Sequence, residues 1–145
     1  MENFGMNLKR VIDIYDIIKE RLPSTYPRPK LAFFEDEACM LDNTDTELNI
    51  EDANVYAIIN PATSTINLPM SMQMEHTNRS GEVIIKSVPI TKQSDYEIAH
   101  TLLHEIAHAY FGEKHGYSSK QYSDESACNI FASRWIRVLY KEKLL

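Results

Sequence analysis

The stretch from Ser94 to Gly112 constrains this chain more than any other, because it has the apolar spacing and the end signals of one long helix. Ser94 and Glu97 form the S-x-x-E pattern that caps the first turn of a helix. Gly112 is suited to end it, so the pattern predicts a helix over about residues 95–112. At about 100° per residue, one side of this helix is apolar. That side holds Ile98, Ala99, Leu102, Leu103, Ile106, Ala107, Tyr110 and Phe111.

The opposite side of the predicted helix is rich in histidine, and it carries Glu97, His100, Thr101, His104, Glu105 and His108. His104 and His108 are one turn apart, about 6 Å along the axis, so both imidazoles can reach one metal ion at about 2.0–2.1 Å. Glu105 lies beside them, where it can act as general base toward a water molecule. A solvated helix side normally carries Lys and Glu rather than a row of His. The pattern therefore predicts a Zn²⁺ site with Glu105 as the catalytic residue.

The H-E-x-x-H pattern resembles the active-site helix of the zincin metallopeptidases, whose classes differ in the third metal ligand. His115 invites comparison with the metzincin pattern, H-E-x-x-H-x-x-G-x-x-H. In this chain, however, Gly112 and His115 follow His108 at +4 and +7 rather than at +3 and +6. Metzincins also have a downstream Met-turn, whereas all six methionines here precede His104. The metzincin interpretation is therefore disfavoured.

A second segment, "SDESACNIFASRW" at residues 123–135, resembles the glutamate-bearing helix of gluzincin-type enzymes. In particular, it is similar to the E-x-x-A-N-x-F-A segment of the compact intracellular ImmA/IrrE peptidases. The matching residues are Glu125, Asn129, Phe131 and Ala132, and Cys128 stands where the family has alanine. The resemblance covers about residues 54–139. It implies a small zincin-like fold, Zn²⁺ held by His104, His108 and Glu125, and a regulatory protease acting on a protein substrate.

The residues themselves also favour Glu125. In a predicted last helix over about residues 121–142, Glu125 falls at the margin of the apolar stripe. A carboxylate directed toward the packed side needs a partner, and a zinc ion supplies one. A first-turn glutamate that interacts with the helix N-terminus is the alternative. Asp124 and His115 stay open as other third ligands.

Further residues are candidates for supporting roles. Asn129, one turn after Glu125, could hydrogen-bond a zinc ligand. Tyr117, Tyr122 or His115 could donate to the oxyanion of the transition state. His100 extends the histidine row and is expected to face the cleft, and Cys128 is expected in the core.

The rest of the chain favours a single domain over residues 1–145 with an α+β fold. The expected arrangement is a short antiparallel sheet packed with an N-terminal helix, the H-E-x-x-H helix and the C-terminal helix bearing Glu125. The segments that support it are a helix at 7–22, a strand at 30–34, an acidic loop at 35–52, a hairpin at 55–69, and a polar connection at 71–94 that holds a possible edge strand at 82–90.

Composition excludes several kinds of partner. The net charge of −6 disfavours nucleic acid. The chain has no run of roughly 18 apolar residues, and no apolar N-terminal stretch suited to a signal peptide, so we expect no membrane partner and a cytoplasmic location. The two cysteines, Cys39 and Cys128, are then expected to be reduced. The oligomeric state stays open.

Together these observations predict a zinc-dependent metallopeptidase in which water, activated by the metal and by Glu105, attacks a peptide bond. The substrate is expected to be a protein or peptide that adds to a sheet edge in the 64–69 or 82–90 region. A catalytically silent zinc-binding or peptide-binding module of the same fold is the alternative. A minor alternative is a deformylase-like amide hydrolase, because "EACML" at residues 37–41 resembles the E-G-C-L stretch of peptide deformylases.

Overall fold

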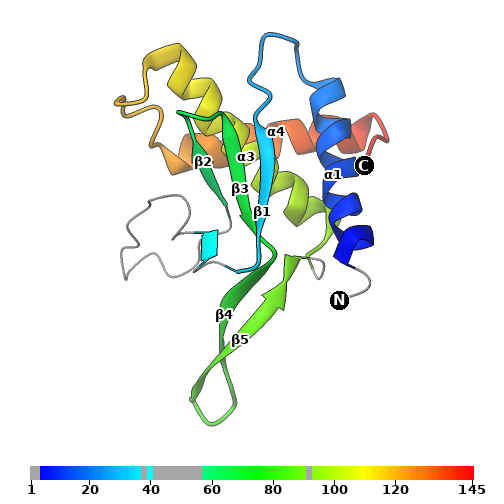
Figure 1. Ribbon diagram of the computed structural model, residues 1–145, viewed down its shortest axis with the longest axis vertical. Coiled ribbons are helices and arrows are strands. Elements are labelled where there is room, and N and C mark those ends of the chain that lie inside the picture. The colour runs from blue at the N-terminus through cyan, green and yellow to red at the C-terminus, as the bar shows by residue number, and fades with distance from the viewer. Residues whose placement is uncertain (1–3, 37–38, 41–56, 91–92) are drawn as a thin grey trace.

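The computed structural model describes residues 4–36, 39–40, 57–90 and 93–145 of the chain (Figure 1). These residues form an α+β fold with a small sheet and three long helices, so the predicted fold class is confirmed. The helices are α1 (Phe4–Arg21), α3 (Asp95–His115) and α4 (Glu125–Lys141). In this part of the chain, no helix is long and apolar enough to cross a membrane. The predicted acidic loop at 35–52 lies largely outside the described residues.

The sheet has three strands, β1 (Lys30–Phe34), β2 (Ile58–Asn60) and β3 (Thr65–Pro69), in the order β1-β3-β2. β2 and β3 pair in antiparallel fashion, which confirms the predicted hairpin. β1 runs parallel to β3, so the expectation of a wholly antiparallel sheet is wrong and the sheet is mixed. Parallel neighbours require a connection of a dozen or more residues, and the chain between β1 and β2 is long enough to supply it.

The central position of β3 overturns one expectation about the substrate. β3 pairs with β1 along Thr65–Pro69 and with β2 at Thr65–Asn67, so residues Thr65–Asn67 are not an exposed sheet edge. The error arose because a hairpin seen in isolation has two free edges, and the sequence did not reveal that β1 pairs with one of them.

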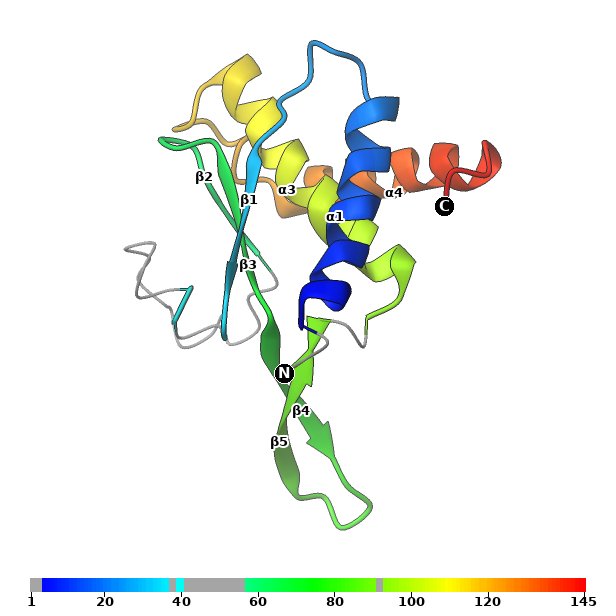
Figure 2. The same cartoon turned by 45° about the vertical axis from the view of Figure 1, so that its right-hand side comes forward.

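A second hairpin projects away from the body of the molecule (Figures 1 and 2). It consists of β4 (Ser71–Thr77) and β5 (Val83–Pro89). The possible strand at 82–90 is thus confirmed, but the polar connection expected at 71–77 is a strand. Its sequence, SMQMEHT, has no β-branched residue before Thr77, which is why it was not predicted as a strand. At the tip, Asn78 Oδ1 accepts hydrogen bonds from the backbone N–H groups of Ser80 and Glu82.

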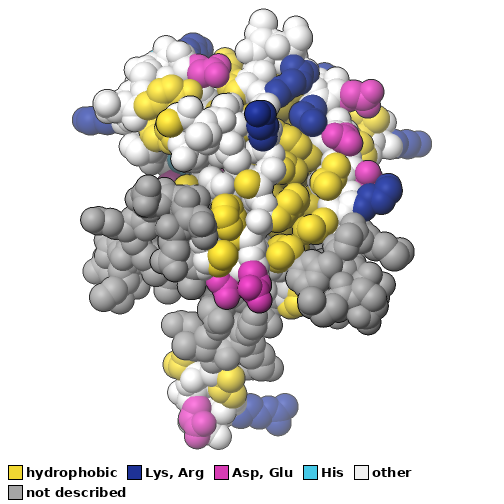
Figure 3. Space-filling view, viewed as in Figure 1, with side chains coloured by type: hydrophobic (Ala, Val, Ile, Leu, Met, Phe, Trp, Pro, Cys, Tyr) yellow, Lys and Arg dark blue, Asp and Glu magenta, His cyan; other side chains and the backbone are white. Residues whose placement is uncertain are grey.

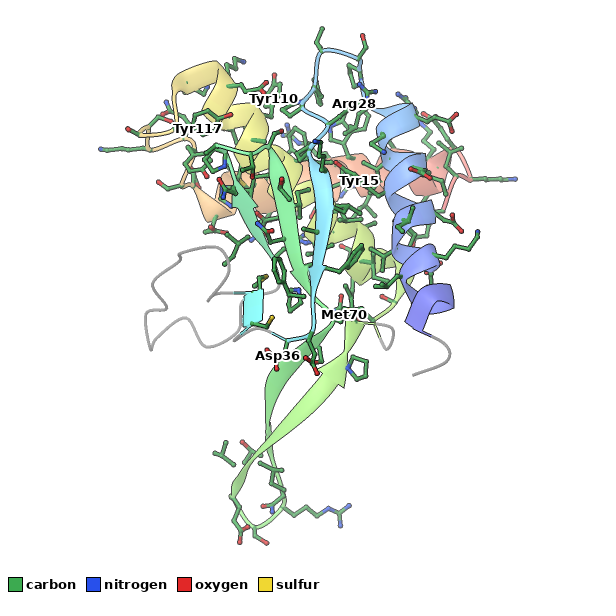
Figure 4. The ribbon with its side chains drawn as sticks, in the orientation of Figure 1. Tyr15, Arg28, Asp36, Met70, Tyr110 and Tyr117 are labelled. Atoms are coloured by element: carbon green, nitrogen blue, oxygen red, sulfur yellow. The ribbon has the colours of Figure 1, made fainter. Side chains whose placement is uncertain are left out.

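The helices gather on one face of the three-stranded sheet, as the rotated view shows (Figure 2). Their apolar sides and the inward residues of the sheet form one core. Its fully buried members include Val11, Ile18, Ile66, Leu68, Ile98, Leu102, Leu103, Ile106 and Leu139. Tyr15 ties α1 to the start of β1, because its hydroxyl donates a hydrogen bond to the carbonyl of Pro29 (Figure 4). The predicted helix at 7–22 is therefore confirmed as α1 and positioned against the sheet.

α3 begins as predicted and ends later than predicted. Ser94 caps it, and its side chain accepts a hydrogen bond from the N–H of Glu97. The helix then continues through Gly112 to His115, and Gly116, at φ 96°, follows as the C-cap. Gly112 is buried, and a Cβ there would overlap the Tyr117 ring and lie 2.9 Å from Cδ1 of Tyr122. Gly112 thus serves close packing of the loop that follows α3 rather than helix termination.

This packing predicts that Gly112→Ala destabilises the protein. Alanine normally stabilises a helix interior by about 1 kcal/mol relative to glycine. Here the added methyl must displace two tyrosine rings, and overpacking of this kind costs about 1–3 kcal/mol. We expect a lower urea midpoint for Gly112→Ala, with Glu113→Ala, at an exposed neighbouring position, close to wild type. A midpoint above that of wild type would show that the tyrosines do not pack on Gly112.

Candidate metal centre

The candidate centre is formed by two helices and the loop that joins them. α3 supplies His104, Glu105 and His108, the set of described residues whose ligand atoms lie within 4.8 Å of one another. The first turns of α4 supply Glu125 and Asn129. The predicted site residues from the two segments are therefore brought together, although 17 residues separate His108 from Glu125 in the sequence.

The ligand atoms of three side chains converge on one point. Nε2 of His104 lies 3.1 Å from Nε2 of His108. The carboxylate of Glu125 spans both rings, with Oε2 2.7 Å from His104 Nε2 and Oε1 3.2 Å from His108 Nε2. Two imidazoles and one carboxylate match the protein ligands of a catalytic zinc site with a position left for substrate or water.

The other nitrogen of each imidazole is already engaged. Nδ1 of His108 meets the backbone carbonyl of Tyr122, which can only accept, so this Nδ1 carries the proton. Nδ1 of His104 lies 2.9 Å from Oδ1 of Asn129 and donates in the same way. In the neutral form of these imidazoles each Nε2 keeps its lone pair, and both lone pairs then face each other and a carboxylate. Such a cluster is stabilised by a cation, and these outer hydrogen bonds are the ones that orient metal-binding histidines.

Glu105 lies on the inner side of the centre, between the imidazoles and the sheet. Its side chain is buried, with 7% of the residue exposed, and it accepts a hydrogen bond from the backbone of Ile59 in β2. Burial, reinforced by the charge of Glu125, raises the pKa of Glu105 to about 8, while the bond from Ile59 acts in the opposite direction. The arrangement places a carboxyl group beside the ligand atoms without using it as a helix cap or an ion-pair partner.

Glu125 reaches the centre from the solvent side. Its side chain is 68% exposed, so the expectation that it points toward the packed side of α4 is wrong. The wheel placed Glu125 at the margin of the apolar stripe, and the members of that stripe that are buried in the core are Ala132, Ile136 and Leu139. α4 begins at Glu125, four residues later than predicted, because residues 117–123 form turns and Asp124 is the N-cap.

The two other candidate third ligands lie elsewhere. Asp124 is the N-cap of α4, and its carboxylate accepts a hydrogen bond from the N–H of Ala127. His115 is in the last turn of α3, about 10 Å along the axis from His108 at 1.5 Å per residue. Its ring stacks on Phe111, with centroids 6.5 Å apart. Neither side chain is directed to the point where the imidazoles meet.

The tyrosine candidates differ in their relation to the centre. The Tyr122 ring meets His108 edge-on at 5.7 Å, and burial and the nearby Glu105 raise the pKa of Tyr122. Tyr117 packs edge-on against Tyr122 at 5.2 Å and lies in the loop beyond α3 (Figure 4). The sequence did not predict the hydrogen bond that His108 Nδ1 donates to the backbone carbonyl of Tyr122, because a main-chain carbonyl leaves no residue signature.

Neither Cys39 nor Cys128 forms a disulfide bond. Cys128 is fully buried, as expected, and burial raises the pKa of its thiol to about 12. Cys39 is half-buried, and its backbone N–H donates to Asp36. Among the described residues, the side-chain group that could hold a metal contains no cysteine, which disfavours a deformylase-like ligand set.

Comparisons of the chain with protein-family models, with curated proteins and with solved structures find no match.

Proposed function

We propose that the protein is a zinc-dependent metallopeptidase of the gluzincin type. His104, His108 and Glu125 hold the ion, and one observation carries the proposal: both Nε2 lone pairs and a carboxylate converge within 3.2 Å while each Nδ1 is engaged elsewhere. When bound, zinc supplies Lewis-acid chemistry, in that it polarises the substrate carbonyl and increases the acidity of water.

Glu105 moves the proton in this proposal. Its carboxylate takes a proton from the attacking water as the new C–O bond forms, and passes that proton to the amine nitrogen as the C–N bond breaks. The group lies beside the histidines, and a cation held there would counter the burial that raises its pKa and so favour the carboxylate form that accepts the proton. Its hydrogen bond from Ile59 fixes the carboxyl orientation.

The substrate in this proposal is an extended peptide, and β2 offers the nearest strand to it. β2 packs against α3, and within the described residues it pairs only with β3. A peptide aligned along β2 would pass the Glu105 carboxyl, because the Ile59 backbone already contacts that group.

A metal analysis combined with a peptide-library cleavage assay tests the proposal. We expect the purified protein to carry zinc, to cleave peptides, and to lose cleavage on chelation and regain it when zinc is added back. Zinc without cleavage of any peptide would favour the silent module. Cleavage restricted to N-formyl peptides would favour the deformylase-like alternative, and the absence of bound zinc would overturn the proposal.

Asn129 is predicted to strengthen zinc binding without touching the ion. Its Oδ1 holds the Nδ1–H of His104, and loss of such a bond lowers metal affinity about 10–100-fold. We expect this weakening in Asn129→Ala and much less of it in Asn129→Asp, which keeps an acceptor. Competition with a chromophoric chelator measures the affinity, and Ile130→Ala, at the adjacent exposed position of α4, is the control. Equal zinc affinities of wild type and Asn129→Ala would show that Asn129 does not contribute to zinc binding.

A further inference from the structure

A row of aromatic rings continues from the metal-binding residues along α3 and onto α4. The ring of His100 stacks on that of His104, with centroids 6.3 Å apart and planes 24° apart. Tyr96 stacks on His100 at 6.2 Å, and Tyr140 of α4 lies 6.5 Å from Tyr96. We refer to Tyr96, His100 and Tyr140 as the aromatic row. It begins in contact with a proposed zinc ligand and ends at the far end of α4.

The two tyrosines of the row are exposed, unlike the other large aromatic residues of these helices. Tyr96 is 47% exposed and Tyr140 44%. The remaining rings pack on one another, and Tyr110, Phe111, Phe131 and Trp135 lie half-buried with Tyr26. The core is complete without the aromatic row, because Ile98, Leu102, Ile136 and Leu139 fill it at 2% exposure or less. The row therefore offers ring faces to solvent beside the candidate centre.

The front face of the molecule has apolar side chains too, but over other elements (Figure 3). Unlike those side chains, the aromatic row adjoins the candidate centre, because His100 stacks on His104. Successive side chains on one side of an extended peptide are about 6.6 Å apart. The ring spacing of 6.2–6.5 Å along the row is close to that repeat. A peptide whose scissile carbonyl lies at the zinc would thus place a neighbouring side chain over His100 and Tyr96.

We infer that the aromatic row is a specificity subsite that binds an aromatic or large apolar side chain of the substrate next to the scissile bond. This inference rests on the proposed peptidase function. Stacking with ring centroids about 4.5–7 Å apart gives aromatic pairs a preference beyond the burial of area, and the exposed rings of Tyr96 and Tyr140 supply the faces. The row thus selects the substrate, while the histidines and Glu105 act on its peptide bond.

Two small hydroxamates test the inference on zinc-loaded wild-type protein. Acetohydroxamate and 3-phenylpropionohydroxamate share the zinc-binding group and differ in a phenylethyl side chain. We expect the aromatic compound to bind about tenfold more tightly, as one stacked and buried ring provides. Tyr96→Ala should reduce this ratio to about twofold, Tyr96→Phe should keep it, and neither should alter zinc content or the affinity for acetohydroxamate.

The controls separate this inference from the proposed function. Ile12→Ala, at an exposed apolar position on α1, should keep the tenfold ratio. Tyr140→Ala should reduce the ratio less than Tyr96→Ala does, because Tyr140 lies one ring farther along the row from the zinc. Equal affinities of wild type for the two compounds, or an unchanged ratio in both tyrosine-to-alanine variants, would overturn the subsite and leave the zinc site standing. A protein that binds neither zinc nor either hydroxamate would overturn both proposals.

Discussion

Glu105→Gln is expected to abolish peptide hydrolysis and to leave the zinc content unchanged. Glutamine keeps the shape of the side chain and an oxygen that accepts the hydrogen bond from Ile59, but it cannot take a proton from water. Loss of a general base lowers the rate by about 10²–10⁴-fold. The zinc content should persist because His104, His108 and Glu125 are untouched. Both expectations are checked on the same preparation, the loss of hydrolysis with a library-derived peptide and the retained zinc by metal analysis.

The matched control for this variant is Glu113→Gln. Glu113 is also on α3, two turns after Glu105, but its side chain is exposed. The Glu113→Gln protein should retain full cleavage, which would show that the loss of cleavage in Glu105→Gln does not come from removing a charge on the helix. Substantial cleavage by Glu105→Gln would reject Glu105 as the base, whatever its zinc content.

Glu125→Ala is expected to lose zinc or to bind it more weakly by orders of magnitude. The substitution reduces the proposed three-ligand site to two imidazoles, because it removes the carboxylate that lies 2.7 Å and 3.2 Å from their Nε2 atoms. Because Glu125 is 68% exposed, its replacement creates no cavity, and the fold should persist. Metal content by mass spectrometry, with the helical signal in circular dichroism as a check on folding, measures the effect.

Asp124→Ala and His115→Ala are the matched controls for Glu125→Ala. Asp124→Ala removes the cap of α4, at a cost of about 1 kcal/mol, yet should retain zinc. His115→Ala should also retain zinc, because His115 lies two turns beyond His108. Metal in Glu125→Ala together with an empty His115→Ala or Asp124→Ala protein would show that the third ligand is assigned wrongly.

Local sequence patterns predicted the elements that depend on residues close together in the chain. The cap at Ser94, the helical spacing after it and the β2–β3 hairpin all depend on residues a few positions apart, and all are present. The parallel pairing of β1 with β3 depends on residues 35 apart, Lys30 and Thr65 among them, and no local pattern encodes it. Gly112 misled the prediction of the helix end because a glycine needed for close packing looks the same as one needed for a turn.

In the candidate site, too, local sequence patterns predicted some contacts and could not predict others. The i, i+4 spacing of His104 and His108 fixes their common face, and the wheel of α4 places Glu125 and Asn129 one turn apart. Two contacts could not be foreseen, namely the backbone groups of Ile59 and Tyr122 that hold Glu105 and His108. Both belong to the main chain, whose position depends on the tertiary fold rather than on residue type.

The proposed ligands and the Ile59 contact differ in how far apart their residues lie in the sequence. Every proposed ligand lies between His104 and Glu125, so closing one short loop between two helices suffices to gather them. Ile59 precedes Glu105 by 46 residues and belongs to the sheet, so its contact requires the whole domain. A folding chain in which α3 and α4 have met, but the sheet has not yet formed, would therefore gather the proposed ligands before Ile59 contacts Glu105. In the proposed peptidase, this order of assembly would delay hydrolysis until the sheet has packed against α3.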